Sequence, residues 1–205
     1  MAYVLGFFTA DGNMIRNKRG AHFIEFTNTD KDLLQKIRKL ICPEHKISIR
    51  DRNGNWRTAY RIQIGSKKIY DDLITLGLSE RKSKKIEFPK VPKEYLSHFV
   101  RGYFDGDGCV TISKYKRANR GGKFAKTILS GFICGSRNFL KDLHKKLKRF
   151  TGLSGGILYY HDGGNRLTFS VKDSLALYNF MYKDVKNNLF LSRKKKKFEK
   201  YFKII

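Results

Sequence analysis

The sequence has few cysteines, few prolines and few acidic residues. Among its 205 residues are three cysteines, three prolines and one tryptophan. Cys42, Cys109 and Cys134 show no close Cys–Cys or Cys–His spacing, so we expect neither a disulfide framework nor a zinc site, and a reducing compartment is favoured. No apolar run approaches the roughly 20 residues of a membrane span. Because the apolar N-terminal stretch carries an aspartate and lacks a basic lead, no signal peptide is expected. These absences predict a soluble intracellular protein with no membrane partner, in a microbial cytoplasm or an organelle.

The scarcity of acidic residues leaves a large positive charge. The chain has 44 Lys and Arg against 18 Asp and Glu, which gives a formal net charge of +26. Such a charge repels itself in a compact state and predicts a polyanionic partner. The basic residues are spread along strand-like segments and not along one amphipathic helix, which favours nucleic acid over an anionic membrane. With 40% hydrophobic residues, the chain can also bury a core.

The chain contains an internal repeat. The stretches VLGFFTADG (4–12) and VRGYFDGDG (100–108) occupy equivalent positions, and each precedes two strands, a helix, a hairpin and another helix. Both copies then close on similar basic phrases, LSERKSKKI and LSRKKKKF. We therefore predict a mixed α+β fold of two pseudo-symmetric αββαββα repeats. The repeats are expected at residues 1–88 and 98–205, with a proline-containing linker at 89–97.

The two motif stretches are expected to be helices, at residues 2–11 and 95–107. Gly6 and Ala10 lie four apart in one, as Gly102 and Gly106 do in the other, so each helix carries a stripe of small residues. Such stripes allow two helix backbones to approach closely.

Asp11 and Asp107 end these helices, and Gly12 and Gly108 follow them. The glycines are predicted to adopt the left-handed conformation that stops a helix. If the stripes pair, both carboxylates meet at helix C-termini, where each costs about 0.3–1 kcal/mol. A hard divalent cation removes that cost, since Mg²⁺ favours carboxylates together with phosphate oxygens and water. A simple Asp-Gly turn is the alternative. A calcium loop is disfavoured, because Cys109 occupies the next ligand position and no glutamate closes the loop.

With these two motifs, the sequence resembles the LAGLIDADG homing endonucleases of the single-chain, two-motif type, and the resemblance covers nearly the whole chain. It implies that the motif helices join the two halves, that each half has a four-stranded antiparallel sheet, and that the two sheets form a DNA-binding saddle. The saddle would lie in the major groove of a long asymmetric duplex DNA site. A monomer would then hydrolyse one phosphodiester per strand across the minor groove and leave short 3′ overhangs. The open reading frame is expected within an intron or an intein-like mobile element.

The resemblance also implies roles for individual residues. Asp11 and Asp107 would bind Mg²⁺, helped by the carbonyls of Ala10 and Gly106. Mn²⁺ or Ca²⁺ can occupy the same sites, Ca²⁺ without turnover. Magnesium there would activate water and stabilise the leaving 3′ oxygen.

Three further positions match the family pattern in part. Lys82 and Lys194 match the basic residue beside each scissile phosphate, with phosphate anchoring or a solvated charge run as the alternative. Asn28 matches the polar residue that orients solvent. In the second half this position is Cys134, a departure that puts a symmetric solvent network in question. Thr9 and Asp105 differ at equivalent positions, so neither is expected to be a shared metal ligand.

Strand alternation predicts which side chains face DNA. We expect Ile47, Ile49, Tyr60, Ile62, Ile64, Val110, Ile112, Leu167, Phe169 and Val171 to face the core. The residues expected to face DNA are Lys46, Ser48, Arg50, Arg52, Arg57, Arg61, Gln63, Thr111, Ser113, Arg166, Thr168 and Ser170. Arg and Gln side chains suit bidentate contacts to guanine and adenine in the major groove.

Two other functions fit the same fold. The first is an intron-RNA maturase with weak or no cleavage, for which the protein's own intron RNA is the partner. The second is a transcription regulator, which would be expected to carry an additional helix-turn-helix domain.

Overall fold

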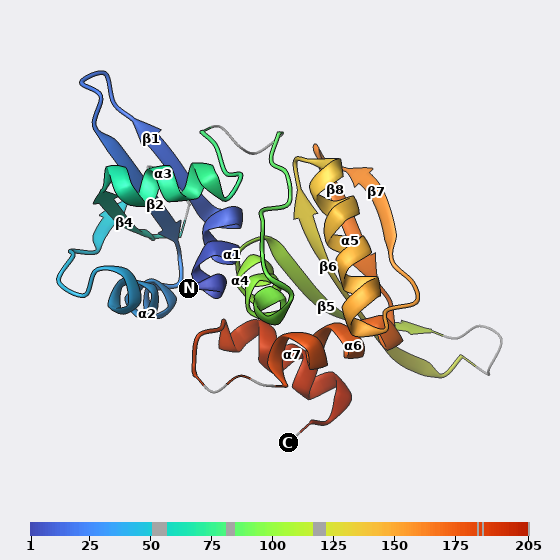
Figure 1. The fold of residues 1–205 in the computed structure, drawn as a ribbon. Helices are drawn as coiled ribbons and strands as arrows, with labels where there is room; N and C mark the ends of the chain where they lie inside the picture. Colours follow the sequence, from blue (N-terminus) through green and yellow to red (C-terminus); the bar gives the residue numbers. More distant parts are fainter. Residues whose placement is uncertain (51–56, 81–84, 117–121, 184, 186, 205) are drawn as a thin grey trace. The chain divides into compact units, whose positions relative to one another are not determined.

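The computed structural model describes residues 1–50, 57–80, 85–116, 122–183, 185 and 187–204. The chain forms two compact units, Met1–Gly106 with Asn187–Phe190, and Asp107–Lys186 with Leu191–Ile205. Each unit contains one four-stranded antiparallel sheet with helices (Figure 1). This confirms the predicted mixed α+β fold with two sheet-containing repeats.

The sheet of the first unit has the strand order β1-β2-β4-β3. Its strands are β1 (Gly12–Arg16), β2 (His22–Asn28), β3 (Ser48–Arg50) and β4 (Ala59–Gly65), and its outer helices are α2 (Lys31–Ile41) and α3 (Lys67–Thr75). Phe7 and Phe8 lie fully buried against Phe26 of β2 and form much of the core. Alternating apolar residues of β2 and β4, such as Ile24, Ile62 and Ile64, complete it.

The motif helices α1 (Ala2–Asp11) and α4 (Leu96–Asp107) pack side by side within the first unit (Figure 1). A Cβ atom added to Gly6 would lie 2.0 Å from the carbonyl oxygen of Phe99, and one added to Gly102 would lie 2.0 Å from that of Tyr3. Only glycine permits backbones this close. The predicted contact through small residues is therefore confirmed.

The predicted left-handed conformation of Gly12 and Gly108 is wrong. Gly12 has φ −83° and ψ 155°, which is extended. Gly108 is the first residue of a strand and does not have a positive φ. Each chain segment passes directly from helix to strand, so no helix-stopping turn is needed. Gly12 is required for space instead, because an added Cβ would lie 2.2 Å from Cδ2 of Phe8.

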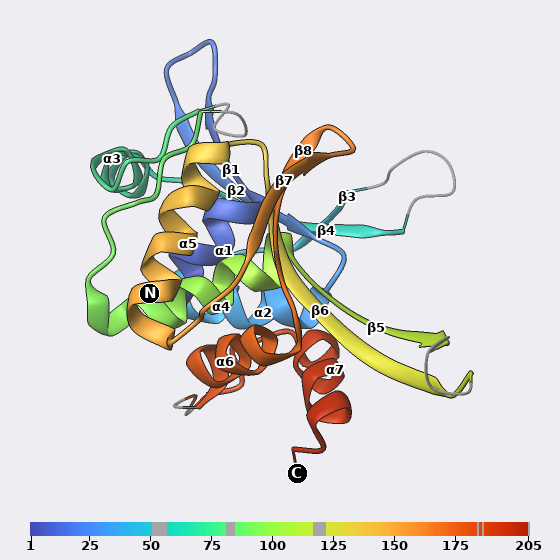
Figure 2. The same cartoon turned by 90° about the vertical axis from the view of Figure 1, so that its right-hand side faces the viewer.

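The second unit repeats the topology, with the strand order β5-β6-β8-β7. Its strands are β5 (Gly108–Lys116), β6 (Phe124–Cys134), β7 (Ile157–His161) and β8 (Gly164–Phe169), and its helices are α5 (Arg137–Thr151), α6 (Val171–Tyr182) and α7 (Ser192–Phe202). The β5–β6 hairpin is long and extends beyond the rest of its sheet (Figure 2). We refer to it as the β5–β6 ribbon.

The compact units differ from the sequence repeats at one element. Although α4 opens the second repeat, it belongs almost entirely to the first unit, because it packs on α1. The segment before it, expected as a linker, packs locally: the amide of Lys90 donates to the carbonyl of Leu76 at 3.3 Å, and a 3₁₀ turn, η2 (Lys93–Tyr95), precedes α4. Among the described residues, no helix is long and apolar enough to cross a membrane.

Candidate active site

Asp11 is the last residue of α1, and a neighbouring strand fixes its carboxylate. The side-chain amide of Asn28 donates a hydrogen bond to Oδ2 of Asp11 at 2.8 Å. Asn28 is itself held, since its Oδ1 accepts the backbone N–H of Asp30 at 2.8 Å. The antiparallel register that pairs Gly12 with Phe26 brings the end of β2 beside the end of α1. Asn28 therefore contacts the acidic residue for which the sequence predicts metal binding.

The second motif helix passes directly beside Asp11. A Cβ atom added to Gly106 would lie 2.3 Å from the Cβ of Ala10 and 3.3 Å from Oδ2 of Asp11. The two residues expected to supply carbonyl ligands, Ala10 and Gly106, are thus in contact across the helix pair. Asp107 is the residue after Gly106, ends α4 and is half-buried.

Thr9 and Asp105 have separate structural contacts. The Thr9 hydroxyl donates to the carbonyl of Leu5 at 2.7 Å. Asp105 is buried, and the Tyr3 hydroxyl donates to its Oδ2 at 2.6 Å. These contacts agree with the expectation that this motif position is not a shared metal ligand.

Lys194 is buried, with only 6% of its surface exposed. Its Nζ donates to the carbonyl of Gly108 at 2.7 Å, and Nζ of Lys197, one helical turn later, donates to that of Val110 at 3.1 Å. The Lys194 ammonium thus lies beside the residue that follows Asp107. Lys82, predicted for the first half, lies outside the described residues.

Burial and the positive charges near Lys194 both affect the pKa of the Cys109 thiol. Burial raises the pKa of the Cys109 thiol above its ordinary value, and the nearby positive charges of Lys194, Arg166 and Lys197 lower it without cancelling the effect. A partly buried position beside several cations suits an anionic substrate.

Cys134 occupies the position that matches Asn28. Its Sγ accepts the backbone N–H of Ser136 at 3.4 Å, as Oδ1 of Asn28 accepts that of Asp30. On the facing strand, Asn165 donates through Nδ2 to the carbonyls of Cys134 (3.4 Å) and Gly135 (3.0 Å). The turn geometry is therefore repeated, whereas the side-chain amide that donates to Asp11 has no counterpart at position 134.

The predicted strand faces of the first unit are partly confirmed. Ile62 and Ile64 are buried, and Arg61 and Gln63, which alternate with them, are half-buried. The exposed residues are Lys46, Ser48, Arg50 and Arg57. Tyr60 and Ile47 are only half-buried, and the core position predicted for Ile49 is wrong, because this side chain is 69% exposed. It lies on β3, a three-residue edge strand whose residues are all exposed. Arg52 lies outside the described residues.

Sequence patterning missed the buried acid Glu25, which contacts two of the predicted DNA-facing arginines. Glu25 is 6% exposed, and its carboxylate oxygens lie 3.5 Å from Nη1 of Arg50 and 3.7 Å from Nη1 of Arg61. The Thr27 hydroxyl also donates to it, at 3.3 Å. Glu25 pairs with Gln63 across β2 and β4, so its side chain faces the same side of the sheet as that of Gln63. The carboxylate therefore restrains both guanidinium groups on that side.

In the second unit the alternation is mostly as predicted. Val110 is buried and Ile112 half-buried, while Thr111 and Ser113 are exposed. Leu167 and Phe169 are buried, while Arg166 and Thr168 are half-buried. The strand positions predicted for Ser170 and Val171 are wrong, because β8 ends at Phe169. Ser170 precedes α6, and Val171 is a helical residue that is 37% exposed. The alternation stops because the chain turns into α6.

The donor set fits a hard divalent cation better than a zinc site. No group of three His, Cys, Asp or Glu side chains among the described residues could hold a metal ion. Mg²⁺ is usually held by one or two carboxylates, with water and substrate phosphates completing its coordination. Asp11, which an amide orients at the end of a helix, and Asp107 each carry a side chain of that type.

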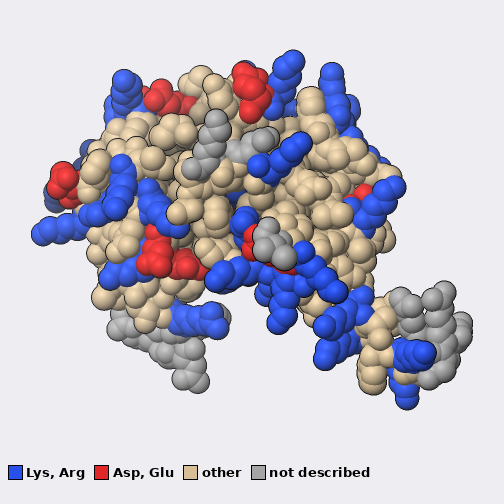
Figure 3. All heavy atoms as spheres, turned by 90° about the horizontal axis from the view of Figure 1, so that it is seen from below, with Lys and Arg blue, Asp and Glu red and all other residues tan. Residues whose placement is uncertain are grey.

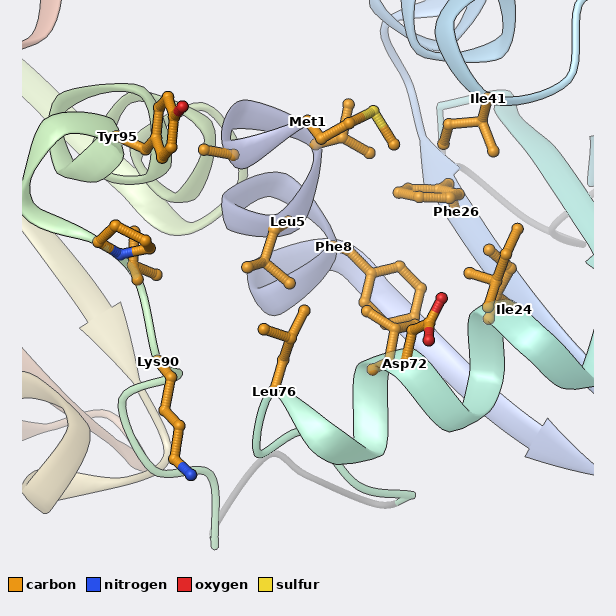
Figure 4. A pocket seen from close by; sticks show the side chains of 16 residues that line it. Met1, Leu5, Phe8, Ile24, Phe26, Ile41, Asp72, Leu76, Lys90 and Tyr95 are labelled. Carbon is orange, nitrogen blue, oxygen red and sulfur yellow. The ribbon is translucent and has the colours of Figure 1, made fainter.

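The first unit also contains a hollow of about 340 Å³ beneath α1 (Figure 4). Apolar side chains from α1, β2 and α3 line it, including Leu5, Phe8 and Ile24. Its polar lining residues are Asp72, Lys90 and Tyr95. This composition does not suit a phosphodiester, so we place the candidate active site at the motif helices.

Several lysine and arginine side chains gather near α7 (Figure 3). That surface agrees with the large net positive charge. It also agrees with a nucleic-acid partner.

Two family models match this chain. Residues 1–75 match a LAGLIDADG-like domain, and residues 100–205 match the LAGLIDADG endonuclease model. The second match covers more than half of the chain. The chain therefore belongs to the LAGLIDADG endonuclease family.

Comparisons with curated proteins and with solved structures give further similarities. An uncharacterized protein of Methanocaldococcus jannaschii is 25% identical over 98% of this chain and 70% of that protein. The replication factor C small subunit of Thermococcus kodakarensis is 29% identical over 76% of this chain but only 18% of its own length. The fold is similar to that of the I-LtrWI LAGLIDADG homing endonuclease bound to target DNA, with a TM-score of 0.67, 14% identity, and 99% of this chain and 88% of that one covered. I-AabMI bound to uncleaved DNA gives the same TM-score and identity over 98% and 88%.

Proposed function

We propose that this protein is a site-specific homing endonuclease that hydrolyses one phosphodiester in each strand of a duplex DNA site and depends on Mg²⁺. The observation that carries this proposal is the arrangement at the end of α1. There the Asp11 carboxylate is held by Asn28 and lies beside Gly106, the residue before Asp107. Family membership supports the same activity.

In this proposal Asp11 and Asp107 hold Mg²⁺, with the carbonyls of Ala10 and Gly106 as further oxygen donors. A bound Mg²⁺ supplies Lewis-acid chemistry, which neutralises charge at a phosphate and makes water a stronger nucleophile. The protein's own residues position the reactants. Asn28 orients the Asp11 carboxylate, and its distance of 2.8 Å is that of a firm hydrogen bond. Lys194, buried beside Gly108, offers a fixed ammonium to a scissile phosphate.

DNA recognition would use the strand faces that carry polar side chains. Arg50, Arg61 and Gln63 suit base edges in the major groove, with the arginines restrained by Glu25. Thr111, Ser113, Arg166 and Thr168 would act in the second half. Because the two halves present different side chains, the site they read would be asymmetric. We also propose that the protein acts as a monomer and is encoded by a mobile element. Its resemblance to a segment of a much longer protein fits an inserted sequence.

The direct test is cleavage of plasmids that carry candidate sites, made by joining the DNA sequences on either side of the open reading frame. We expect discrete linear products with short 3′ overhangs in Mg²⁺ and none in EDTA. Asp11→Asn should abolish cutting, whereas the control Asp32→Asn, at an exposed residue of α2, should not. Binding to intron RNA, with no cut at any candidate site, would contradict the endonuclease and indicate a maturase.

A further inference from the structure

A lysine-rich groove lies in the second unit, between the β5–β6 ribbon and α7. It has a volume of about 730 Å³, and five of its lining residues are lysines. Lys114 and Lys126 come from the ribbon, and Lys197, Lys200 and Lys203 come from α7 and its C-terminal end. All five are exposed. Figure 3 shows lysine and arginine side chains gathered at this end of α7 and along the ribbon.

The two ribbon lysines of the groove lie on the opposite face of the ribbon from Ser113, one of the residues predicted to face DNA. Another such residue, Thr111, also lines the groove. Lys114 pairs with Lys126 in the β5–β6 register, two positions beyond the pair Ile112 and Ile128. Side chains two apart along a strand share a face, and Ile128 is fully buried in the core. The side chains of Thr111 and Ser113 alternate with these residues and therefore point to the other face, while Thr111 also borders the groove. The two lysines thus continue the helix-covered side of the sheet.

The Lys114–Lys126 pair is unfavourable in the protein alone. Like charges directly opposite each other in an antiparallel pair are destabilising. No described acidic residue forms an ion pair with any of the five groove lysines. The α7 acid, Glu199, is instead occupied by Lys195, at 2.5 Å, and by the Tyr178 hydroxyl. Lysines near a helix C-terminus are stabilised by the helix dipole, but this does not explain the two lysines on the ribbon.

Two hydrogen bonds fix the groove. Nζ of Lys197 donates to the carbonyl of Val110 at 3.1 Å, and the Tyr201 hydroxyl donates to that of Lys126 at 3.1 Å. They hold α7 against both strands of the ribbon. The lysines therefore converge on a shaped surface and not on a loose charged tail.

We propose that this groove binds the phosphodiester backbone of duplex DNA flanking the sequence that the sheets contact. The inference rests on the proposed function, because that function makes DNA the polyanion. Among the described residues that line the groove, the charged ones are all lysines, which act as point charges on phosphates, and none is Arg, Asn or Gln; the polar uncharged lining residues are Thr111 and Tyr201. The contact should therefore be independent of sequence and should lengthen the bound duplex beyond the recognised site.

The test compares the variant Lys114→Gln/Lys126→Gln/Lys200→Gln/Lys203→Gln with a control of equal charge, Lys141→Gln/Lys145→Gln/Lys148→Gln/Lys172→Gln. The four control lysines are exposed and lie on α5 and α6. Affinity is measured against salt concentration with a short and a long duplex of unrelated sequence. On the long duplex we expect the groove variant to bind at least about tenfold more weakly. Its log–log salt slope should be smaller by about 3–4, since each lost phosphate contact removes about 0.9. The control should change little.

Three results would overturn the groove proposal. The first is equal behaviour of the groove variant and the control, and the second is an equal loss on short and long duplexes. The third is a loss of affinity that is seen with an RNA duplex and not with a DNA duplex, which would indicate a different partner. A second measurement tests the ribbon repulsion and guards against misfolding: without DNA, the double variant Lys114→Gln/Lys126→Gln should have an unchanged or higher melting temperature, and a fall would count against the proposal. At saturating DNA, the groove variant should still cleave the target. The proposed function is tested separately, because it would be refuted by a wild-type protein that cuts no DNA.

Discussion

At the scale of single residues, the candidate site depends on side chains that fix the position of other side chains through hydrogen bonds and ion pairs. Asn28 holds Asp11, and Glu25 holds Arg50 and Arg61. Both residues of the first pair were predicted to belong to the site, Asn28 as a residue that orients solvent, but their hydrogen bond follows from the pairing of β1 with β2. The second could not, since Glu25, Arg50 and Arg61 are distant in sequence and meet only through the pairing of β2, β4 and β3. Ile49 was placed wrongly because alternation cannot show that its strand is a short edge.

Glu25 should affect which DNA sequences are bound. We expect Glu25→Gln to remove the charge that restrains Arg50 and Arg61, and so to reduce discrimination against substituted bases by about tenfold. A good bidentate base contact is worth about 1–3 kcal/mol. The measurement is cleavage of a panel of single-base variants of the target. Glu44→Gln, at an exposed residue, is the control, and unchanged discrimination in Glu25→Gln would show that the carboxylate has no such role.

The pKa of the Cys109 thiol can test the position of the Lys194 charge without a cleavage assay. Because burial raises the pKa of the Cys109 thiol, its thiolate fraction at neutral pH is below that of an ordinary cysteine. Lys194 lowers this pKa, so Lys194→Met should move the midpoint of the alkylation-rate profile to higher pH. Mass spectrometry of alkylated protein measures the midpoint, with Lys196→Met as the control. A midpoint that moves to lower pH or stays fixed would contradict the position of the Lys194 ammonium.

At the scale of elements, the sequence predicted the helices and strands well because periodicity and capping residues are local signals. Ser136 caps α5, because its hydroxyl accepts the backbone N–H of Phe139 at 3.3 Å. The spacing of Gly6 and Gly102 correctly predicted the contact between α1 and α4. The conformation of Gly12 was predicted wrongly, because a glycine after a helix can serve either a left-handed turn or a close contact. Only the position of Phe8 distinguishes these two uses.

The helix contact should be intolerant of a single methyl group. Gly6→Ala would place a Cβ 2.0 Å from the carbonyl oxygen of Phe99, so the helices must separate. We expect the free energy of unfolding to fall by about 3 kcal/mol, at the upper end of overpacking costs. Gly65→Ala is the control, because its Cβ would meet Phe23 at an ordinary 3.4 Å. Denaturant unfolding measures both variants, and equal stabilities would refute the tight packing of α1 on α4.

At the scale of the whole molecule, the net charge of +26 should make DNA binding strongly dependent on salt. A protein that contacts about 6–10 phosphates loses about 10³–10⁵-fold in affinity between about 50 and 200 mM salt. We expect a loss in this range for duplex DNA, measured by fluorescence anisotropy across salt concentrations. A nearly flat dependence would mean that phosphate contacts do not dominate binding.

The central claim is that each half of the chain supplies one carboxylate for Mg²⁺-dependent hydrolysis. Strand-resolved cleavage tests it most directly, with both strands of the target end-labelled and the wild type compared with Asp11→Asn/Asp107→Asn. We predict that the wild type cuts each strand once in Mg²⁺ and neither strand in EDTA. The double variant should bind the target as tightly and cut neither strand. Cleavage of either strand by the double variant at the wild-type rate would contradict the account.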